Sequence, residues 1–293
     1  MIWILFTLFY GLAKGGREIC KKKALERNGV IEVLFFYTLL SFIFVVPEVG
    51  NAGGLDYRQY LLIALKSFVI FVAWMCSFYA IKKLPVSVMG IFDLSRVLFA
   101  TLMGVVFLHE TMKYNQVFGL VLVAVGLVIL PIPNIIAAKN PDSKIKVQTE
   151  PIKPIFVIIA LLSCVLNAVS STLDKYLMGT DMTSGQLQFW YMLFMVLYYG
   201  IYILIKKIKI HWKNLFKNHW IWIMSILFVI ADRALFIANG DPDSKITMMT
   251  LIKQAGCLVT IIGGRLVFKE KNILFKLICA AIIVAGIVVT VII

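Results

Sequence analysis

The chain has 293 residues, of which 61% are hydrophobic and only 15% charged, and its formal net charge is +14. A typical soluble domain is about 45–50% apolar and about 25% charged, so the composition excludes a soluble domain, a disordered chain and a disulfide scaffold. It indicates a polytopic membrane protein, in which a positive charge reflects basic connections rather than nucleic-acid binding.

Ten apolar stretches follow one another along the chain, each close to the roughly 20 residues that a spanning helix needs. We expect the helices at 2–24, 30–49, 60–81, 85–107, 115–133, 154–177, 185–205, 218–239, 245–268 and 272–293. A polar linker at 134–153 separates a first five-helix repeat, 1–133, from a second one, 154–293. The predicted fold class is therefore an all-α polytopic membrane protein with ten transmembrane helices.

The two halves of the chain resemble each other in sequence. Arg96 lies eleven residues after Pro85, and Lys253 lies eleven residues after Pro242. "VVFLHE" at 105–110 matches "RLVFKE" at 265–270, and "REICKKKAL" at 17–25 matches "SSTLDKYLM" at 170–178. An odd number of helices per repeat means that the second repeat enters the membrane from the opposite side. This inverted arrangement is typical of alternating-access transporters, whose substrate sits at the midplane; the alternative is a duplication that only stabilises the bundle.

The segments 105–130 and 265–289, together with "SSTLDKYL" at 170–177, are similar to the EamA-type branch of the drug/metabolite transporter (DMT) superfamily. The resemblance extends over nearly the whole chain. It implies a membrane transporter built from two inverted five-helix repeats, and it implies nothing specific about the substrate. The charged segment "YGLAKGGRE" at 10–18 departs from the mostly apolar first helix of that family.

Lysine and arginine are distributed unevenly between the connections. The connections that follow odd-numbered helices hold 18 of these residues, and the alternate connections hold 4. Because basic connections stay in the cytoplasm, we expect these connections inside and both termini outside. The expected location is the plasma membrane, crossed many times.

Two cations lie near the middle of predicted spans at matching repeat positions, namely Arg96 and Lys253. A charge at this depth is costly, so it usually faces a cavity or a partner. We expect both to bind an anionic group of the substrate, although Arg96 is also spaced for a salt bridge with Asp93. Lys253 has no acid at helical spacing within its span, so Asp232 on another helix is a candidate partner, and the favoured alternative is an unpaired cation that awaits an anionic group. Lys66 lies near a span end, where it is expected to snorkel to the surface.

The first helix carries Lys14, Arg17 and Glu18, and Lys14 is spaced to pair with Glu18. Its repeat mate carries Asn167 and Ser170, so both helices are expected to line the cavity. Trp74 is a further expected lining residue, although aromatic residues more often serve packing. The alternative is that the first span ends early and residues 14–23 form a basic interfacial stretch.

The function that these features favour is secondary transport of small polar metabolites, either amino acids or small organic anions. Glu18, Asp93 and Asp232 are the expected proton-coupling or ion-pair residues. No nucleotide-binding motif is present, so a gradient or exchange must drive the transport. The alternatives are a flippase for lipids or lipid-linked sugars and, less favoured, a membrane-embedded enzyme, for which neither HExxH nor GxSxG is present.

The remaining features are expected to be structural. Glu110 and Glu270 follow apolar spans, where each carboxylate is expected to cap the helix that follows it. Small residues such as Gly119, Gly126 and Gly286 suit close helix packing, including a homodimer face. The five cysteines form no metal-binding pattern, and neither a metal site nor a cofactor is expected.

Overall fold

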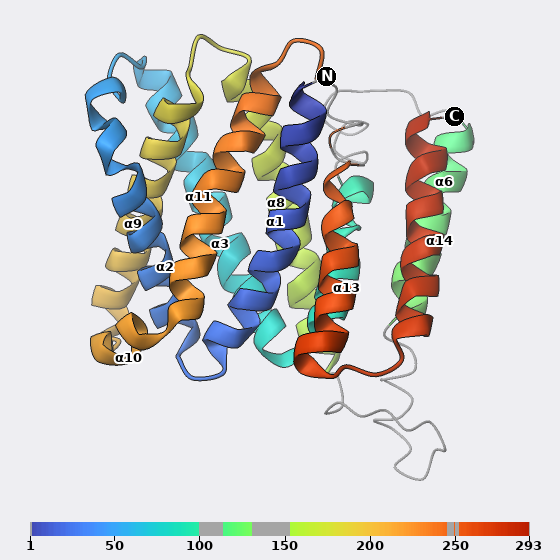
Figure 1. Cartoon of the computed structure of the whole chain (residues 1–293). Coiled ribbons are helices and arrows are strands. Elements are labelled where there is room, and N and C mark those ends of the chain that lie inside the picture. Colours follow the sequence, from blue (N-terminus) through green and yellow to red (C-terminus); the bar gives the residue numbers. More distant parts are fainter. Residues whose placement is uncertain (1, 100–113, 131–152, 245–248, 250–251, 293) are drawn as a thin grey trace.

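The computed structural model describes residues 2–99, 114–130, 153–244, 249 and 252–292, and every regular element in these ranges is a helix. Glu110 and nearly all of the expected linker lie outside the described residues. The helices, as labelled in Figure 1, are α1 Ile2–Leu25, α2 Val30–Val45, the 3₁₀ helix η1 Val46–Asn51, α3 Tyr57–Lys83, α4 Val86–Asp93, α6 Tyr114–Ile129, α8 Pro154–Met178, α9 Ser184–Lys206, α10 Trp212–Lys217, α11 His219–Gly240, α13 Ala255–Phe268 and α14 Ile273–Ile292.

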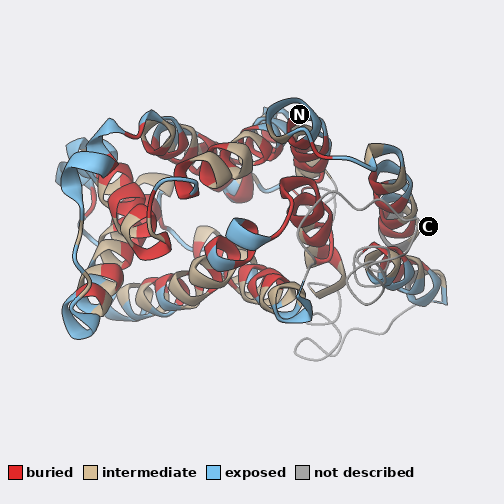
Figure 2. Cartoon of the chain, turned by 90° about the horizontal axis from the view of Figure 1, so that it is seen from below, coloured by how far each residue is buried: buried red, intermediate tan, exposed pale blue. Residues whose placement is uncertain are grey.

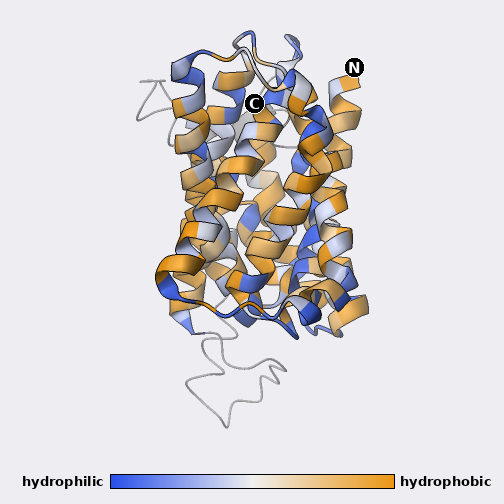
Figure 3. Ribbon diagram, turned by 90° about the vertical axis from the view of Figure 1, so that its left-hand side faces the viewer, coloured by the Kyte–Doolittle hydropathy of each residue, from blue (hydrophilic) through white to orange (hydrophobic). Residues whose placement is uncertain are grey.

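The helices are long and apolar enough for a membrane. In the described part of the chain, five helical segments meet the length and composition of a spanning helix, and three shorter apolar helices accompany them. Large hydrophobic side chains such as Leu204 and Leu266 are 77% and 74% exposed. Figure 3 shows hydrophobic residues over the flanks of the bundle, and Figure 2 shows that buried residues face its inside. The bilayer therefore covers these flanks, and the protein is an all-α polytopic membrane protein.

Several helix contacts occur in pairs that the predicted inverted repeat would exchange. The two termini lie at the same end of the molecule (Figure 1). α1 packs along α11, and their repeat counterparts α8 and α3 pack along each other in the same way. α2 packs on its own counterpart α9, and α6 packs on α14. These pairings fit a two-fold axis in the membrane plane, although α1 packs on α13 more extensively than α8 packs on α4, so the inverted repeat stays a prediction.

The fourth and ninth predicted spans are both interrupted near their middle. α4 ends at Asp93, a turn follows, and the helix resumes at Arg96. In the second repeat, Gln254 forms a turn between Lys253 and the start of α13. Non-helical backbone at membrane depth is tolerated where it lines a cavity, and transporters use such breaks at their substrate sites. Arg96 and Lys253 each border one of these breaks.

Glu270 is a helix cap, but not of the helix that follows it. Its carboxylate accepts hydrogen bonds from the backbone N–H of Val86, at 2.7 Å, and from the Ser87 hydroxyl, at the start of α4 in the other repeat. Lys276 on α14 donates to the same carboxylate at 2.8 Å. The expectation from sequence is corrected because tertiary packing brings the α4 N-terminus to this buried acid, which thus joins the two repeats.

Glycines allow close packing at two helix contacts. A Cβ on Gly11 would lie 2.9 Å from the carbonyl oxygen of Lys253, so α1 approaches the break before α13 closely. A Cβ on Gly286 would lie 2.6 Å from the carbonyl oxygen of Gly119, so these glycines join α14 to α6 within one chain. These small residues are therefore used inside the protomer, and the homodimer stays a prediction that rests on other surfaces.

Candidate functional site

A polar cavity of about 130 Å³ lies in the middle of the bundle, enclosed by α1, α3, α8 and α11 with single residues from α2 and α9. The two interrupted spans contribute Asp93, Arg96, Lys253 and Gln254. Since one water needs roughly 10–15 Å³ by the same measure, the cavity holds roughly ten waters or one small metabolite. All ten site residues expected from sequence line it, namely Lys14, Arg17, Glu18, Trp74, Asp93, Arg96, Asn167, Ser170, Asp232 and Lys253.

α1 presents one polar face to this cavity. Tyr10, Lys14, Arg17 and Lys21 follow at helical spacing, and all four line the cavity. Arg17 and Lys21 are only 9% and 7% exposed, and α1 continues unbroken to Leu25. The alternative in which residues 14–23 form an interfacial stretch is therefore wrong. Lys21 is therefore a cavity residue as well.

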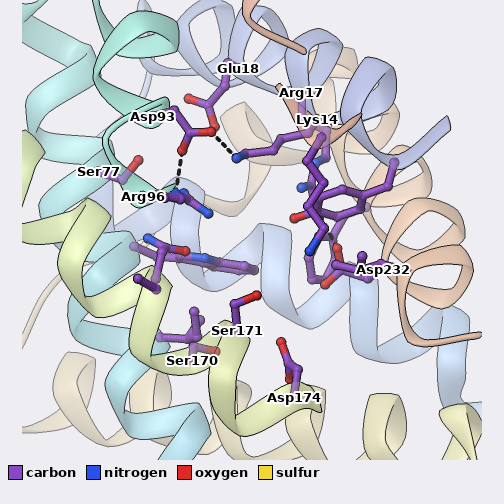
Figure 4. A pocket seen from close by; sticks show the side chains of 18 of the residues that line it. Lys14, Arg17, Glu18, Ser77, Asp93, Arg96, Ser170, Ser171, Asp174 and Asp232 are labelled. Carbon is purple, nitrogen blue, oxygen red and sulfur yellow. Dashed lines mark hydrogen bonds and ion pairs between the residues drawn. The ribbon is translucent and has the colours of Figure 1, made fainter. Parts of the chain in front are cut away.

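Asp93 holds two cations from different elements. Arg96 Nε lies 2.6 Å from Asp93 Oδ1, the salt bridge that the sequence spacing had suggested. Lys14 donates to the other oxygen of the same carboxylate (Figure 4). Lys14 thus pairs with Asp93 rather than with Glu18. Glu18 Oε1 instead accepts a hydrogen bond from Lys21 Nζ at 2.5 Å. One acid shared by two cations leaves a surplus positive charge on this side of the cavity.

The opposite side of the cavity combines an ion pair with aromatic rings. Arg17 faces Asp232 at 3.5 Å, which is a long contact for a charged pair. The Arg17 guanidinium also lies over the Phe228 ring, 4.8 Å from its centroid. Trp74 packs edge-to-face on Phe228, with ring centroids 5.2 Å apart, and it lies tilted against the Tyr37 ring, with centroids 5.3 Å apart. This aromatic wall keeps Arg17 in place and supplies the cavity with apolar surface.

Lys66 and Asp174 form a buried pair that reasoning from the sequence missed. Lys66 is 1% exposed, its Nζ lies 2.9 Å from Asp174 Oδ1, and it sits over the Tyr191 ring at 3.5 Å. The expectation that Lys66 snorkels is therefore wrong. α3 begins at Tyr57, three residues before its predicted start, which places Lys66 more than two turns inside the helix. The signal in the sequence that would have revealed the pair was Asp174, an acid on α8 at the same depth in the bundle as Lys66.

Lys253 differs from the other cavity cations. Within the described residues, no carboxylate lies within ion-pair distance of its ammonium group, because Asp232 faces Arg17 and Asp174 faces Lys66. Its side chain contacts the Tyr10 ring, whose centroid lies 5.8 Å from Nζ. The pairing of Lys253 with Asp232 that the sequence suggested is not formed. Lys253 therefore carries a positive charge that an anion in the cavity would compensate.

α8 contributes the neutral polar wall of the cavity. Asn167 donates to the backbone carbonyl of Ser163 at 2.6 Å and is 8% exposed, and Ser170 is 2% exposed. Ser170, Ser171 and Asp174 lie on one face of α8, opposite Lys14 and Arg17 (Figure 4). Hydroxyl and amide groups of this kind orient a polar solute without adding charge.

The described lining of the cavity has an excess of positive charge. It contains six cations and four acids, hence a formal charge of +2, from Lys14, Arg17, Lys21, Lys66, Arg96 and Lys253 against Glu18, Asp93, Asp174 and Asp232. The four acids pair with five of the cations, because Asp93 holds two of them. Lys253 and one of the two partners of Asp93 therefore keep a positive charge that no acid balances. Within the described ranges, no cluster of three histidine, cysteine or acidic side chains suits a metal ion. The arrangement suits a small solute with an anionic group.

Comparison with known proteins identifies related sequences for the first half and related folds for the whole. Residues 1–131 match the EamA-like transporter family. No curated protein matches the chain. Among the 27 solved chains that match, a crystal structure described only as "Crystal structure of protein" shares 13% identity and a TM-score of 0.62. That match covers 98% of this chain and 95% of the other, and at this identity it shows the fold alone.

Proposed function

We propose that the chain, whose residues 1–131 match the EamA-like transporter family, is a membrane transporter of the drug/metabolite type and carries small polar metabolites with an anionic group. Amino acids and small organic anions are the proposed substrates. The plasma membrane is the proposed location, with both termini outside the cell, because the basic connections collect at the other end of the bundle.

The observation that carries this proposal is the uncompensated charge in the cavity. The described lining has a formal charge of +2, and Lys253 has no ion-pair partner within it. A partly buried cation without a partner costs free energy, so the presence of Lys253 at a matching repeat position favours a ligand that completes the pair. Arg96 and Lys253, on the two interrupted spans, are the proposed anchors for that anion, and Arg17 is a third cation on the same cavity.

The size of the cavity supports a small solute over a lipid. A space of about 130 Å³ accommodates a metabolite of a few heavy atoms to amino-acid size. A flippase substrate has acyl chains that need a groove open to the bilayer. Uptake of a soluble solute by proteoliposomes, compared with scrambling of a labelled lipid, separates the two functions.

Transport would proceed by alternating access between the inverted repeats. Coupling to protons requires an acid whose partner can leave it, and Asp232 meets this condition best because its contact with Arg17 is 3.5 Å. Asp93, by contrast, is held by both Lys14 and Arg96. An anionic substrate that draws Arg17 away from Asp232 would leave this carboxylate free to take up a proton.

The proposal is tested by screening the purified protein for thermal stabilisation against a library of metabolites. A ligand that binds only the folded state raises the apparent stability, by about 2.7 kcal/mol at a concentration 100 times its Kd. We expect hits among carboxylates or phosphates, and we expect Lys253→Gln to lose them. Hits confined to cationic or uncharged compounds would contradict the proposal.

A further inference from the structure

A second cavity, which shares no residue with the central one, lies at the end of the bundle that holds the basic connections. Its volume is about 450 Å³ by the same measure. Lys23 at the end of α1 and the loop residues Glu26, Arg27 and Asn28 form one wall. The other wall comes from the end of α10 and the start of α11, and it comprises Asn214, Lys217, Asn218, His219 and Trp220. The cavity therefore joins the two repeats.

The floor of this cavity is fixed by buried amides. Asn218 donates to the side-chain oxygen of Asn28 at 2.7 Å and to the backbone oxygen of Ala24 at 3.1 Å. Its own side-chain oxygen accepts from the backbone N–H of Trp220. Asn28 and Asn218 are only 7% and 8% exposed, so these hydrogen bonds are shielded from water. The cavity is thus a built feature with a rigid base rather than a gap between loops.

The walls of this cavity are positively charged. Lys23 is neutralised by Glu26, which its ammonium contacts at 2.9 Å and 3.3 Å. Arg27 and Lys217 have no acidic partner within ion-pair distance among the described residues, and Glu26 is the cavity's one acid there. The described lining therefore carries a formal charge of +2, with Arg27 on one wall and Lys217 on the other.

Aromatic side chains place this end of the bundle at the membrane surface. Trp212 and Phe216 on α10 are 44% and 55% exposed, and Phe216 packs edge-to-face on Phe36 with ring centroids 4.8 Å apart. Trp222 donates from its ring N–H to the backbone oxygen of Phe216. Tryptophan and other aromatic residues of this kind settle at the level of the lipid headgroups. The cavity is therefore expected at the level of the lipid headgroups.

We propose that this cavity binds the phosphate group of an anionic membrane phospholipid. A guanidinium binds phosphate through two parallel hydrogen bonds, and an ammonium adds a point charge. Basic pockets at the cytoplasmic ends of transmembrane helices bind anionic headgroups in this way. The exposed rings of Trp212 and Phe216 on the same short helix put the cavity at headgroup level, which is why a lipid fits the site better than free phosphate. The proposal does not depend on the transported substrate.

The test is native mass spectrometry of the purified protein with phosphatidylglycerol or phosphatidylcholine added. We expect one tightly held phosphatidylglycerol, and we expect the double change Arg27→Gln with Lys217→Gln to weaken it about 10- to 30-fold. The matched control is Lys209→Gln with Lys213→Gln, which removes the same charge from the same end but not from the cavity. It should bind the lipid as the unchanged protein does.

Two results would overturn the proposal. If the cavity variant and the control lost affinity for phosphatidylglycerol equally, lipid binding would depend only on the general surface charge. Displacement of the lipid by inorganic phosphate at millimolar concentration would show that the site takes a soluble phosphate. Because all four substituted residues lie at the surface, melting temperatures in phosphatidylcholine should be alike, which confirms that the variants fold.

Discussion

Replacing Lys253 by glutamine should weaken ligand binding while leaving the empty protein at least as stable as before. The reason is that its ammonium has no ion-pair partner in the described cavity and contacts the Tyr10 ring at 5.8 Å. Removing a partly buried charge without a partner ends its desolvation cost, which insertion scales put at about 2.5–3.5 kcal/mol for a charge at the membrane centre. Part of that cost is already offset by nearby acids, so the expected gain in the free energy of unfolding is about 0–2 kcal/mol.

The loss of binding is expected to be large. A charge-assisted hydrogen bond to an anionic ligand contributes about 1.5–3 kcal/mol, so the Kd for a carboxylate or phosphate ligand should rise about 10- to 150-fold. The matched control is Lys66→Gln, which removes the same charge from the same cavity but strips Asp174 of its partner at 2.9 Å. Breaking a buried pair in this way should lower the free energy of unfolding by about 3–5 kcal/mol.

Thermal unfolding of both variants, with and without the ligand, separates the two roles. The account predicts opposite signs for stability, with Lys253→Gln unchanged or more stable and Lys66→Gln less stable. If Lys253→Gln were destabilised as much as Lys66→Gln, Lys253 would be a structural cation with an ion-pair partner. The inference that Lys253 is unpaired would then be wrong.

The other predictions concern the salt bridge, the cap and the topology. Arg96→Gln should reduce transport strongly, and adding Asp93→Asn should restore it only if the pair is structural; recovery in the double variant would remove Arg96 from the substrate site. Burial alone would raise the pKa of Glu270, which lies between α13 and α14, but the nearby ammonium group and its hydrogen bonds hold that pKa below the ordinary glutamate value. Glu270 therefore stabilises the fold above its unfolded pKa of about 4.3, and this contribution is lost as the pH falls below that. Glu270→Gln should abolish that part of the acid dependence of the melting temperature, and an unchanged pH profile would contradict it. Single cysteines at positions 144 and 213 should label only from the cytoplasm, and labelling from outside intact cells would reverse the topology.

The helices and the cavity residues were predictable because the membrane imposes simple rules. A stretch of about 20 apolar residues has to form a helix, and a charge within it has to face the interior. These two rules suffice to place Lys14, Arg17 and Asp232 in one cavity from the order of the residues alone. The interruption of the first span by charged residues did not stop the helix, because the cavity gives those charges partners.

Apart from the local pair of Arg96 with Asp93, the ion-pair partners were not predictable, because they depend on contacts between residues far apart in the sequence. Helical spacing suggested that Lys14 pairs with Glu18, whereas packing brings Lys14 to Asp93, 79 residues away. Lys66 was misjudged since an error of a few residues at the start of α3 moves a side chain from the surface to the core. Glu270 likewise caps α4 rather than its own next helix, which no local pattern reveals.

Uptake into proteoliposomes is the measurement that tests the proposed transport most directly. The purified protein, reconstituted with the ligand that stabilises it best in the metabolite screen, should exchange internal unlabelled ligand for external labelled ligand. The account predicts that Lys253→Gln slows this exchange at least tenfold at ligand concentrations below the Kd, while the melting temperature stays the same or rises. Exchange by Lys253→Gln at the rate of the unchanged protein would contradict the claim that this cavity cation binds the transported anion.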